Sequence, residues 1–295
     1  MALKSVFKKI TLGSVLLHLT LLGFGLLCLF PFLLVIATSL TDEPDLTKHG
    51  YQLIPPKISM AAYEYLLNDP AMIIRSYGIT TSVTLLGTII GLFITSMLAY
   101  ALSRKDFPLA RSFVFYVFFT MLFSGGLVPT YILVTRYLHL KDTIWALIAP
   151  YLVIPFFVLL LRSFFVTISE AIIESAKMEG AGEFWIYFRI ILPLSLPALA
   201  TVGLFQVLMY WNDWFLALLY IENSRLFPLQ YILVSLMANI DFLSTTVTTV
   251  TTQALVPAES ARMAMAIVAT GPVIFIFIFL QKYFIRGLTV GAIKG

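Results

Sequence analysis

The sequence predicts an all-α fold class, a polytopic membrane protein with six transmembrane helices. Hydrophobic residues make up 60% of its 295 positions and charged residues only 12%, about half the charged share of an ordinary soluble domain. Uncharged apolar stretches of roughly 20 residues recur along the chain, and an α-helix needs about that length to cross a bilayer core. Composition and recurrence together exclude a soluble globular domain.

Six stretches without Asp, Glu, Lys or Arg mark the expected spans. They are residues 12–41, 76–103, 112–135, 143–161, 190–212 and 263–281, and the fifth continues past Asp213 to residue 221. The first is uncharged for 30 residues, which is too long for a cleaved signal peptide, so we expect it to remain as a span. A seventh stretch, 226–240, is short and polar enough for an amphipathic helix at the membrane surface.

The distribution of Lys and Arg predicts how the chain crosses the membrane. With the N-terminus in the cytoplasm, 12 of the 19 Lys and Arg residues fall on the cytoplasmic side, in line with the positive-inside rule. We therefore expect a multi-pass protein of the cytoplasmic (inner) membrane, in contact with membrane lipid, with both termini in the cytoplasm. The net charge of +4 follows from this bias, so no nucleic acid is expected as a partner. The single cysteine, Cys28, and the lack of a Cys/His cluster predict neither a disulfide nor a metal site.

The loops divide the chain into two expected parts. Residues 1–75 hold the first span and an outer loop, which Pro44, Pro55 and Pro56 keep irregular. Residues 76–295 hold the other five spans as a core, with a cytoplasmic loop at 167–193 between the fourth and fifth.

The 167–193 loop carries more organised charge than a short connection needs. Thr167 and Glu170 have the spacing of a capping box, so a helix can begin there, and Gly180 and Gly182 are natural helix terminators. A second helical segment then leads into the fifth span. On these residues alone, a docking surface for a partner and a merely amphipathic surface loop fit equally well.

The same loop resembles the EAA motif of ABC importer permeases, a pattern E-A-A-x-x-x-G-A followed by I-x-L-P. The chain reads Glu-Ser-Ala at 174–176, Gly-Ala at 180–181 and Ile-Ile-Leu-Pro at 190–193. It departs from the family pattern at Ser175, where a second Ala is usual, and at Glu179, where Asp is frequent. Four strings extend the resemblance over essentially the whole chain to the MalG-like sugar permeases and their LplC/YtcP-like branch: FSGGLVPTYILV, YWNDWFLALLYI, FPLQYILV and RGLTVGAIKG.

This resemblance implies a type I ABC importer permease fold, in which the motif forms a coupling helix that docks into a cleft of an ATP-hydrolysing subunit. The residues that it assigns to ATPase coupling are Glu174, Ser175, Ala176, Glu179, Gly180 and Ala181. The C-terminal residues Gly291, Lys294 and Gly295 are implied to reach the ATPase pair as well. The implied partners are a second homologous permease subunit, two ATP-binding subunits and an extracytoplasmic solute-binding protein. ATP and Mg would bind to the partner ATPase subunits, so the chain itself is expected to need no cofactor.

Polar groups inside a span are costly and often functional, and the fifth span carries several. Gln206, Tyr210 and Asp213 are spaced by four and three residues, so they share one helical face, and Trp211 and Asn212 adjoin them. Aromatic faces stack on sugar rings, and amides and carboxylates bond to hydroxyls, so these residues form the candidate substrate path. An outer aromatic belt, with Asp213 in headgroup water, is the other interpretation.

The third span contains Gly125, Gly126 and Pro129. Adjacent glycines and a proline break or kink a helix and also let neighbouring helices approach closely. The triplet is therefore either a gate hinge in the transport path or a packing notch.

The chain carries no enzyme motif. It has no G-x-x-x-x-G-K-[ST] phosphate loop, no H-E-x-x-H and no G-x-S-x-G, so ATP hydrolysis is expected in partner subunits. A secondary transporter of a small polar solute is the alternative. Such proteins usually place ionisable residues near the membrane midplane, and spans one, two, four and six have none there.

The expected function is therefore that of a permease subunit in a binding-protein-dependent ABC importer that takes up an oligosaccharide by alternating access. The LplC/YtcP-like branch further implies a complex or acidic oligosaccharide, such as aldouronate, rhamnogalacturonan or alginate fragments. The sequence itself determines neither the identity nor the length of that oligosaccharide.

Overall fold

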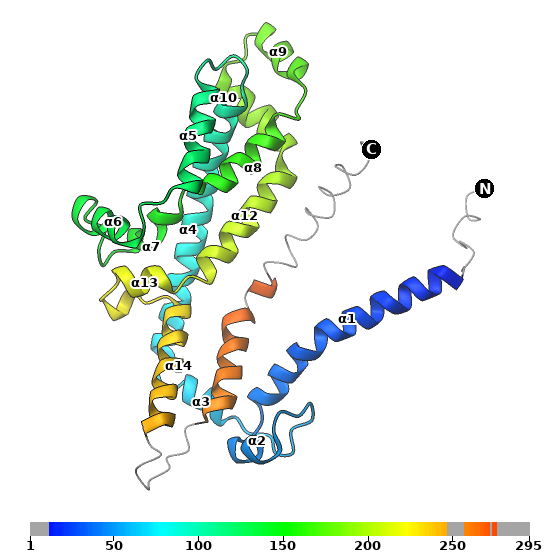
Figure 1. Ribbon diagram of the computed structural model, residues 1–295, viewed down its shortest axis with the longest axis vertical. Coiled ribbons are helices and arrows are strands. Elements are labelled where there is room, and N and C mark those ends of the chain that lie inside the picture. Colours follow the sequence, from blue (N-terminus) through cyan, green and yellow to red (C-terminus); the bar gives the residue numbers. More distant parts are fainter. Residues whose placement is uncertain (1–11, 247–256, 272, 276–295) are drawn as a thin grey trace. The chain divides into compact units, whose positions relative to one another are not determined.

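The computed structural model describes residues 12–246, 257–271 and 273–275, most of which lie in helices (Figure 1). Within these ranges the only β-type pairing is an isolated bridge between Thr41 and Ile58. The predicted all-α fold class is confirmed.

Two helices in the described ranges are long and apolar enough to cross a membrane unbroken. They are α1 (Leu12–Ser39) and α4 (Pro70–Ser103), and they match the first and second predicted spans. α4 begins at Pro70 rather than at residue 76 because the charge of Arg75 ends an uncharged run without interrupting a helix. A proline in the first turn is tolerated as well, since its missing N–H has no intrahelical acceptor there.

The third predicted span is broken in two. α5 (Ala110–Leu122) ends before the glycine pair, and α6 (Leu127–Ile132), continued by the π-helix η1 (Leu133–Tyr137), leaves at 110°. Gly126 lies between them at φ +86°, a left-handed conformation that glycine adopts without strain. Residues 112–135 therefore do not form one continuous helix.

The fourth predicted span is bent by 49°. α7 (Ile144–Ile148) and the 3₁₀ turn η2 (Ala149–Tyr151) precede α8 (Pro155–Phe165). The residue before a proline avoids the helical region, and Ile154 is accordingly extended at φ −101° and ψ 120°.

The fifth predicted span is bent as well. α10 (Glu183–Ile186), η3 (Tyr187–Ile191) and α11 (Leu192–Leu194) run as one helical segment, and α12 (Leu196–Trp211) then leaves at 82°. Ser195 forms the corner at φ −101° and ψ 8° and is fully buried.

The count of six spans is not established by the described residues. If each bent pair is one span, these residues hold up to five. The sixth predicted span, 263–281, is helical at 263–271 and 273–275, and its remaining positions lie outside the described residues.

The chain divides into two units by its contacts, and each is described by itself. The first contains α1, α2 (Glu43–His49) and α3 (Ala61–Leu66), together with described residues between 237 and 269. In it, the Glu43 carboxylate accepts hydrogen bonds from the backbone N–H groups of Glu259 and Ser260 at 2.9 and 3.1 Å. Glu43 thereby caps the helical residues 258–271. The division into residues 1–75 and 76–295 remains a prediction.

The second unit holds the elements that the candidate site uses. α4 packs along α8 and α12, and α5 packs on α8 (Figure 1). Fully buried side chains such as Leu161, Ile186 and Ile191 form one apolar cluster, and Ile148, Ala217 and Tyr220 belong to another. The remaining elements of this part of the chain are α9 (Glu170–Met178), α13 (Phe215–Tyr220), η4 (Ser224–Leu226) and the beginning of α14 (Leu229–Thr246).

Candidate functional site

The first helix of the 167–193 loop begins later than its sequence suggested. α9 starts after Ser169, and the Thr167 hydroxyl donates a hydrogen bond to the Phe164 carbonyl at 2.7 Å. The predicted capping box is wrong, because Thr167 belongs to the end of α8 and does not cap α9.

Gly180 ends α9 in the left-handed conformation, at φ +83°. The Gly180 N–H donates to the Lys177 carbonyl at 2.9 Å, and the Ala181 N–H donates to the Ala176 carbonyl at 3.0 Å. This pair of bonds defines a Schellman turn. Ala176 is buried and Ala181 packs against the same apolar cluster, so a hydrophobic contact also closes the turn. The prediction that Gly180 terminates the helix is confirmed, and Gly182 instead precedes α10 in an extended conformation, at φ −76°.

The six residues that the resemblance assigns to ATPase coupling divide by exposure. Four are exposed: Glu174, Ser175, Glu179 and Gly180. Ala176 is buried and Ala181 is half-buried, so these two hold α9 to the core. Met178 is 89% exposed, so the outward face of α9 combines carboxylates with a bare apolar side chain.

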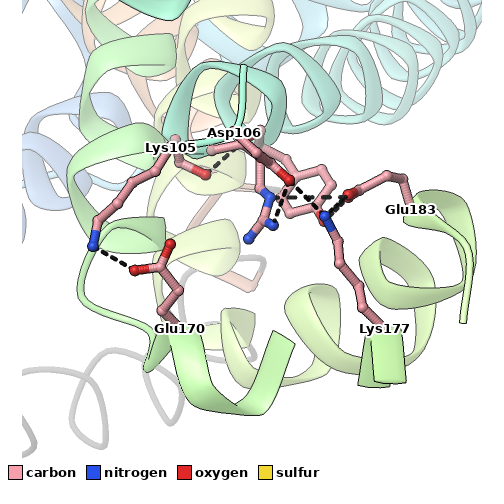
Figure 2. Close-up of polar contacts among 8 residues, drawn as sticks. Lys105, Asp106, Glu170, Lys177 and Glu183 are labelled. Atoms are coloured by element: carbon pink, nitrogen blue, oxygen red, sulfur yellow. Dashed lines mark hydrogen bonds and ion pairs between the residues drawn. The ribbon is translucent and has the colours of Figure 1, made fainter. Parts of the chain in front are cut away.

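Charged side chains from three segments meet beside this turn (Figure 2). Lys177 of α9 lies between Asp106, in the loop after α4, and Glu183 of α10, with Nζ–O distances of 2.5 and 2.6 Å. Arg104 pairs with Asp106 at 3.1 Å and lies 3.9 Å from Glu183. The Tyr100 hydroxyl donates to Glu183 at 2.6 Å. We call these five residues the charged network, and it joins the end of α4 to both helices of the loop.

The charged network shifts the pKa of its two carboxyl groups and of its lysine in the direction that keeps each of them ionised. The hydrogen bond from Lys177, with a smaller contribution from Arg104, lowers the pKa of Asp106. Partial burial works to raise the pKa of Glu183, but the hydrogen bonds from Lys177 and Tyr100 outweigh it, and that pKa is lowered as well. Hydrogen bonds to Asp106 and Glu183 raise the pKa of Lys177. All three side chains are therefore charged at neutral pH.

A second ion pair also links the loop after α4 to α9. Lys105 pairs with Glu170, the first residue of α9 (Figure 2). None of Arg104, Lys105 and Asp106 was predicted from the sequence as a site residue. The sequence signal for these residues was the run of three charged side chains directly after the second predicted span. No spacing rule could pair Asp106 with Lys177, which is 71 residues away.

Tyr210 of α12 is buried directly against a glycine of α4. A Cβ on Gly87 would lie 2.5 Å from the Tyr210 ring, so the ring occupies the space that a side chain at Gly87 would need. The Tyr210 hydroxyl donates to the Ile148 carbonyl at 3.0 Å. Gly87 and Gly91 were not predicted as contact residues, although small residues four apart are a known signal of close helix packing in membranes.

Gln206 lies one turn along the same helix and faces the second glycine. A Cβ on Gly91 would lie 2.9 Å from the Leu152 carbonyl oxygen and 3.0 Å from Gln206 Nε2. Gln206 is fully buried, and neither atom of its amide has a hydrogen-bond partner among the described residues. An unpaired amide inside a membrane protein costs free energy, which favours a functional reason for its presence. Its predicted place in the substrate path remains a prediction, as does that of Tyr210.

Trp211 and Asn212 complete the end of α12. Trp211 is buried, and its ring centre lies 6.4 Å from that of Tyr77. Asn212 is exposed and donates its side-chain amide to the Leu208 carbonyl at 2.8 Å. Their contact with a solute also remains a prediction.

Asp213 lies beyond α12. Its carboxylate accepts a hydrogen bond from the Tyr151 hydroxyl at 3.1 Å and from the Leu216 N–H at 3.1 Å, so it holds the first turn of α13. Because α12 ends at Trp211, Asp213 does not continue a helical face with Gln206 and Tyr210. The expectation of one shared face is wrong for Asp213, and its assignment to the path stays a prediction.

Gly125, Gly126 and Pro129 lie at the exposed break between α5 and α6. A Cβ on Gly126 would meet nothing within 4 Å, and one on Gly125 would meet only Pro129. The predicted break is present, and no other described segment packs against the glycine pair. A gating role for this triplet stays a prediction.

The C-terminal residues assigned to the ATPase pair, Gly291, Lys294 and Gly295, lie outside the described residues. Their role also remains a prediction.

Known proteins are similar to this chain over most of its length. A family model for the inner membrane component of binding-protein-dependent transport systems matches residues 91–290. The polygalacturonan/rhamnogalacturonan transport system permease protein YtcP of Bacillus subtilis (strain 168) is 37% identical over 287 residues, which cover 97% of this chain and 100% of the relative. Protein LplC of the same organism is 38% identical over 273 residues, 92% of each chain.

A solved structure is similar in fold as well. It is the crystal structure of a bacterial ABC transporter involved in the import of the acidic polysaccharide alginate, with a TM-score of 0.77 and 29% identity over 91% of this chain and 95% of that chain. The family match includes the 167–193 loop, α12 and α4 from Gly91 onward. The chain therefore belongs to the family of inner-membrane components of binding-protein-dependent transport systems and is a permease subunit of an ABC importer.

Proposed function

We propose that this permease moves an acidic oligosaccharide into the cytoplasm by alternating access, driven by ATP hydrolysis in partner subunits. It would lie in the cytoplasmic membrane with both termini in the cytoplasm. It would pair with a second homologous permease and two ATP-binding subunits, and receive its solute from an extracytoplasmic binding protein. The chain itself would bind neither ATP nor Mg.

The observation that carries this proposal is the exposed face of α9 on a rigid turn. Glu174, Ser175 and Glu179 point outward, while buried Ala176 and the Schellman turn at Gly180 hold the helix against the core. A helix that exposes one face and is fixed to the core by its C-terminal turn can transmit a displacement that a docked partner imposes on it.

The charged network offers a route from α9 into the membrane. Lys177 joins α9 to Asp106 in the loop directly after α4 and to Glu183 of α10. A displacement of α9 would therefore act on α4 and, through α10 and the corner at Ser195, on α12. Such a displacement would bias a two-state equilibrium between inward-facing and outward-facing arrangements.

The substrate class follows from the relatives. The names of YtcP and of the solved transporter concern polygalacturonan, rhamnogalacturonan and alginate, which supports an acidic oligosaccharide for this chain. Asp213 would be a poor direct ligand for a uronate, because both are negatively charged. Its hydrogen bonds to Tyr151 and α13 give this carboxylate a structural role instead, which is compatible with an acidic substrate.

The test is transport by the full complex in proteoliposomes. The chain is reconstituted with its partner permease, ATPase subunits and binding protein, and ATP-driven uptake is compared for oligogalacturonate, oligoalginate and a neutral maltooligosaccharide. Preference for an acidic oligosaccharide is expected. Uptake of only the neutral sugar would contradict the substrate class, and uptake driven by an ion gradient without ATP would favour a secondary transporter.

A pair of glycine variants tests the coupling role of α9. Gly180→Ala forces a side chain into the left-handed conformation, at a cost of about 1–2 kcal/mol, and should lower solute-stimulated ATPase activity. Gly182→Ala is the matched control, because Gly182 has an ordinary φ of −76° and open space around it. Equal stimulation in both variants would contradict the coupling role, and ATP hydrolysis by the purified chain alone would contradict the division of labour.

A further inference from the structure

A basic cavity of about 690 Å³ lies where α4 ends, α5 begins and α8 leads into α9. Its charged lining residues are Arg104, Lys105, Arg111, Arg162 and Glu170. Four of these five side chains are cations and one is an anion. The remaining lining is largely apolar, with Val114, Phe165 and Ile173 among its members.

Two of the four cations are compensated by carboxylates. Lys105 pairs with Glu170, and Arg104 pairs with Asp106 in the charged network. Arg162 donates its Nε to the Leu102 carbonyl at 2.9 Å, and neither Arg111 nor Arg162 forms an ion pair within the described part of the chain. The basic cavity therefore keeps two guanidinium groups without a counter-charge.

The N-terminus of α5 adds to this surplus of positive charge. It lies at Ala110 and Arg111, borders the same cavity and has no side-chain cap. A helix N-terminus presents free N–H groups and a partial positive charge, so it favours an anion.

We propose that the basic cavity binds a phosphate group, with Arg111 and Arg162 as its contacting residues. Guanidinium groups match phosphate oxygens with paired hydrogen bonds. The cavity lies at the ends of helices that cross the membrane, on the side predicted to face the cytoplasm, and its apolar wall suits the acyl chains of a lipid. These features favour an anionic phospholipid headgroup as the source of the phosphate, and free phosphate is the other source. This inference does not depend on the proposed substrate.

The test places the full chain in nanodiscs of phosphatidylcholine and titrates in phosphatidylglycerol, with bound lipid read by native mass spectrometry. Arg111→Gln and Arg162→Gln should each weaken phosphatidylglycerol binding roughly tenfold or more, as expected for loss of a charge-assisted hydrogen bond. Arg111 is exposed, so Arg111→Gln is expected to fold and stays informative if Arg162→Gln does not.

Arg189→Gln is the matched control. Arg189 is exposed, is predicted to lie on the same side of the membrane and does not line the basic cavity. Diffuse attraction of the basic surface would weaken binding by about fivefold whichever arginine is removed. Equal losses in all three variants would overturn the proposal. So would the absence of a preference for phosphatidylglycerol over phosphatidylcholine, if inorganic phosphate also fails to stabilise the chain.

A second arm separates the two sources of phosphate. Inorganic phosphate is titrated against the chain in pure phosphatidylcholine, with thermal stability as the readout. If inorganic phosphate stabilises the wild type but not Arg111→Gln, and phosphatidylglycerol does not, the phosphate site stands with a soluble ligand. Stabilisation by phosphatidylglycerol alone assigns the site to lipid.

Discussion

α4 is held at two places by different physics. Along its middle, Gly87 and Gly91 lie directly against Tyr210 and Gln206 of α12, with no room for even a Cβ. At its end, Asp106 and the other members of the charged network are joined to the 167–193 loop by ion pairs between partly exposed side chains. The first contact depends on shape and the second on charge.

This difference predicts which of the two contacts of α4 can rearrange. The hydrophobic effect does not drive helices together in lipid, so close packing at small residues stabilises their association. Such closely packed surfaces fit together in few other arrangements. Ion pairs near water are individually weak, about 0–1 kcal/mol each, and can exchange partners. We therefore expect α4 and α12 to move as one body when α9 is displaced, and the ion pairs between α4 and the 167–193 loop to rearrange during that movement.

The largest expected effect comes from filling the space at Gly91. A Cβ there would lie 2.9 Å from a backbone carbonyl, which cannot turn away as a side chain can, so Gly91→Ala should destabilise the protein by about 1–3 kcal/mol. Unfolding in detergent, followed by circular dichroism, measures this. Gly203→Ala is the control, because its Cβ would meet Leu92 of the same interface at an ordinary 3.6 Å. Equal stability of the two variants would show that the interface is looser than described.

The next effect concerns Gln206 and has the opposite sign. Its amide is buried without a partner, so Gln206→Leu, of similar volume, should stabilise the protein by about 1–2 kcal/mol. If Gln206 lies in the substrate path, the same variant loses uptake while gaining stability. A drop in stability would instead show that the amide is satisfied in the membrane-embedded protein.

A smaller effect is expected from the charged network. The coupling free energy between Lys177 and Asp106, measured in a double-mutant cycle with Lys177→Met and Asp106→Asn, should be about 0.2–1 kcal/mol. It should fall as salt is added, because the pair is partly exposed. The more exposed pair Lys105–Glu170 should couple less strongly. Coupling that ignores salt, or exceeds the effect of Gly91→Ala, would reverse the proposed contrast between shape and charge.

The smallest effect is the dependence of the charged network on pH. The pKa of Asp106 is lowered from 3.8 and that of Glu183 from 4.5, so their contribution to stability is present above those values and is lost as the pH falls through the lowered pKa. The pKa of Lys177 is raised from 10.5, so its contribution is present below that value and is lost at still higher pH. The stability difference between wild type and Asp106→Asn should therefore stay flat at neutral pH and vanish in acid. A change near neutral pH would argue against this network.

Several features of the fold could be predicted from short stretches of sequence. The apolar runs predicted α1 and α4, the glycine pair predicted the break before α6, and Gly180 was expected to end α9. Each depends on composition or on backbone preferences within a few residues. The capping box at Thr167 failed because α8 extends to Phe165 and takes the Thr167 hydroxyl, and the end of a preceding helix depends on its packing.

The candidate site was predictable in part. The family was recognisable from residues that lie close together in the sequence, and the family match over residues 91–290 confirms it. The coupling role assigned to the loop motif remains a prediction. Asp106 and its partners were overlooked, because the pairing of Asp106 with Lys177 joins residues that are 71 positions apart. Charge alone does not say which of several nearby carboxylates a lysine will meet.

The length of the apolar runs and the local residue pattern were enough to predict a helical membrane protein with an EAA-like motif. The three-dimensional structure was needed to show that Tyr210 and Gln206 face Gly87 and Gly91 and that Asp213 caps α13. Helical periodicity places a residue on one face of its helix, but which neighbour covers that face depends on how the helices break and pack. The corner at Ser195 and the end of α12 at Trp211 fix where these residues lie relative to their neighbours.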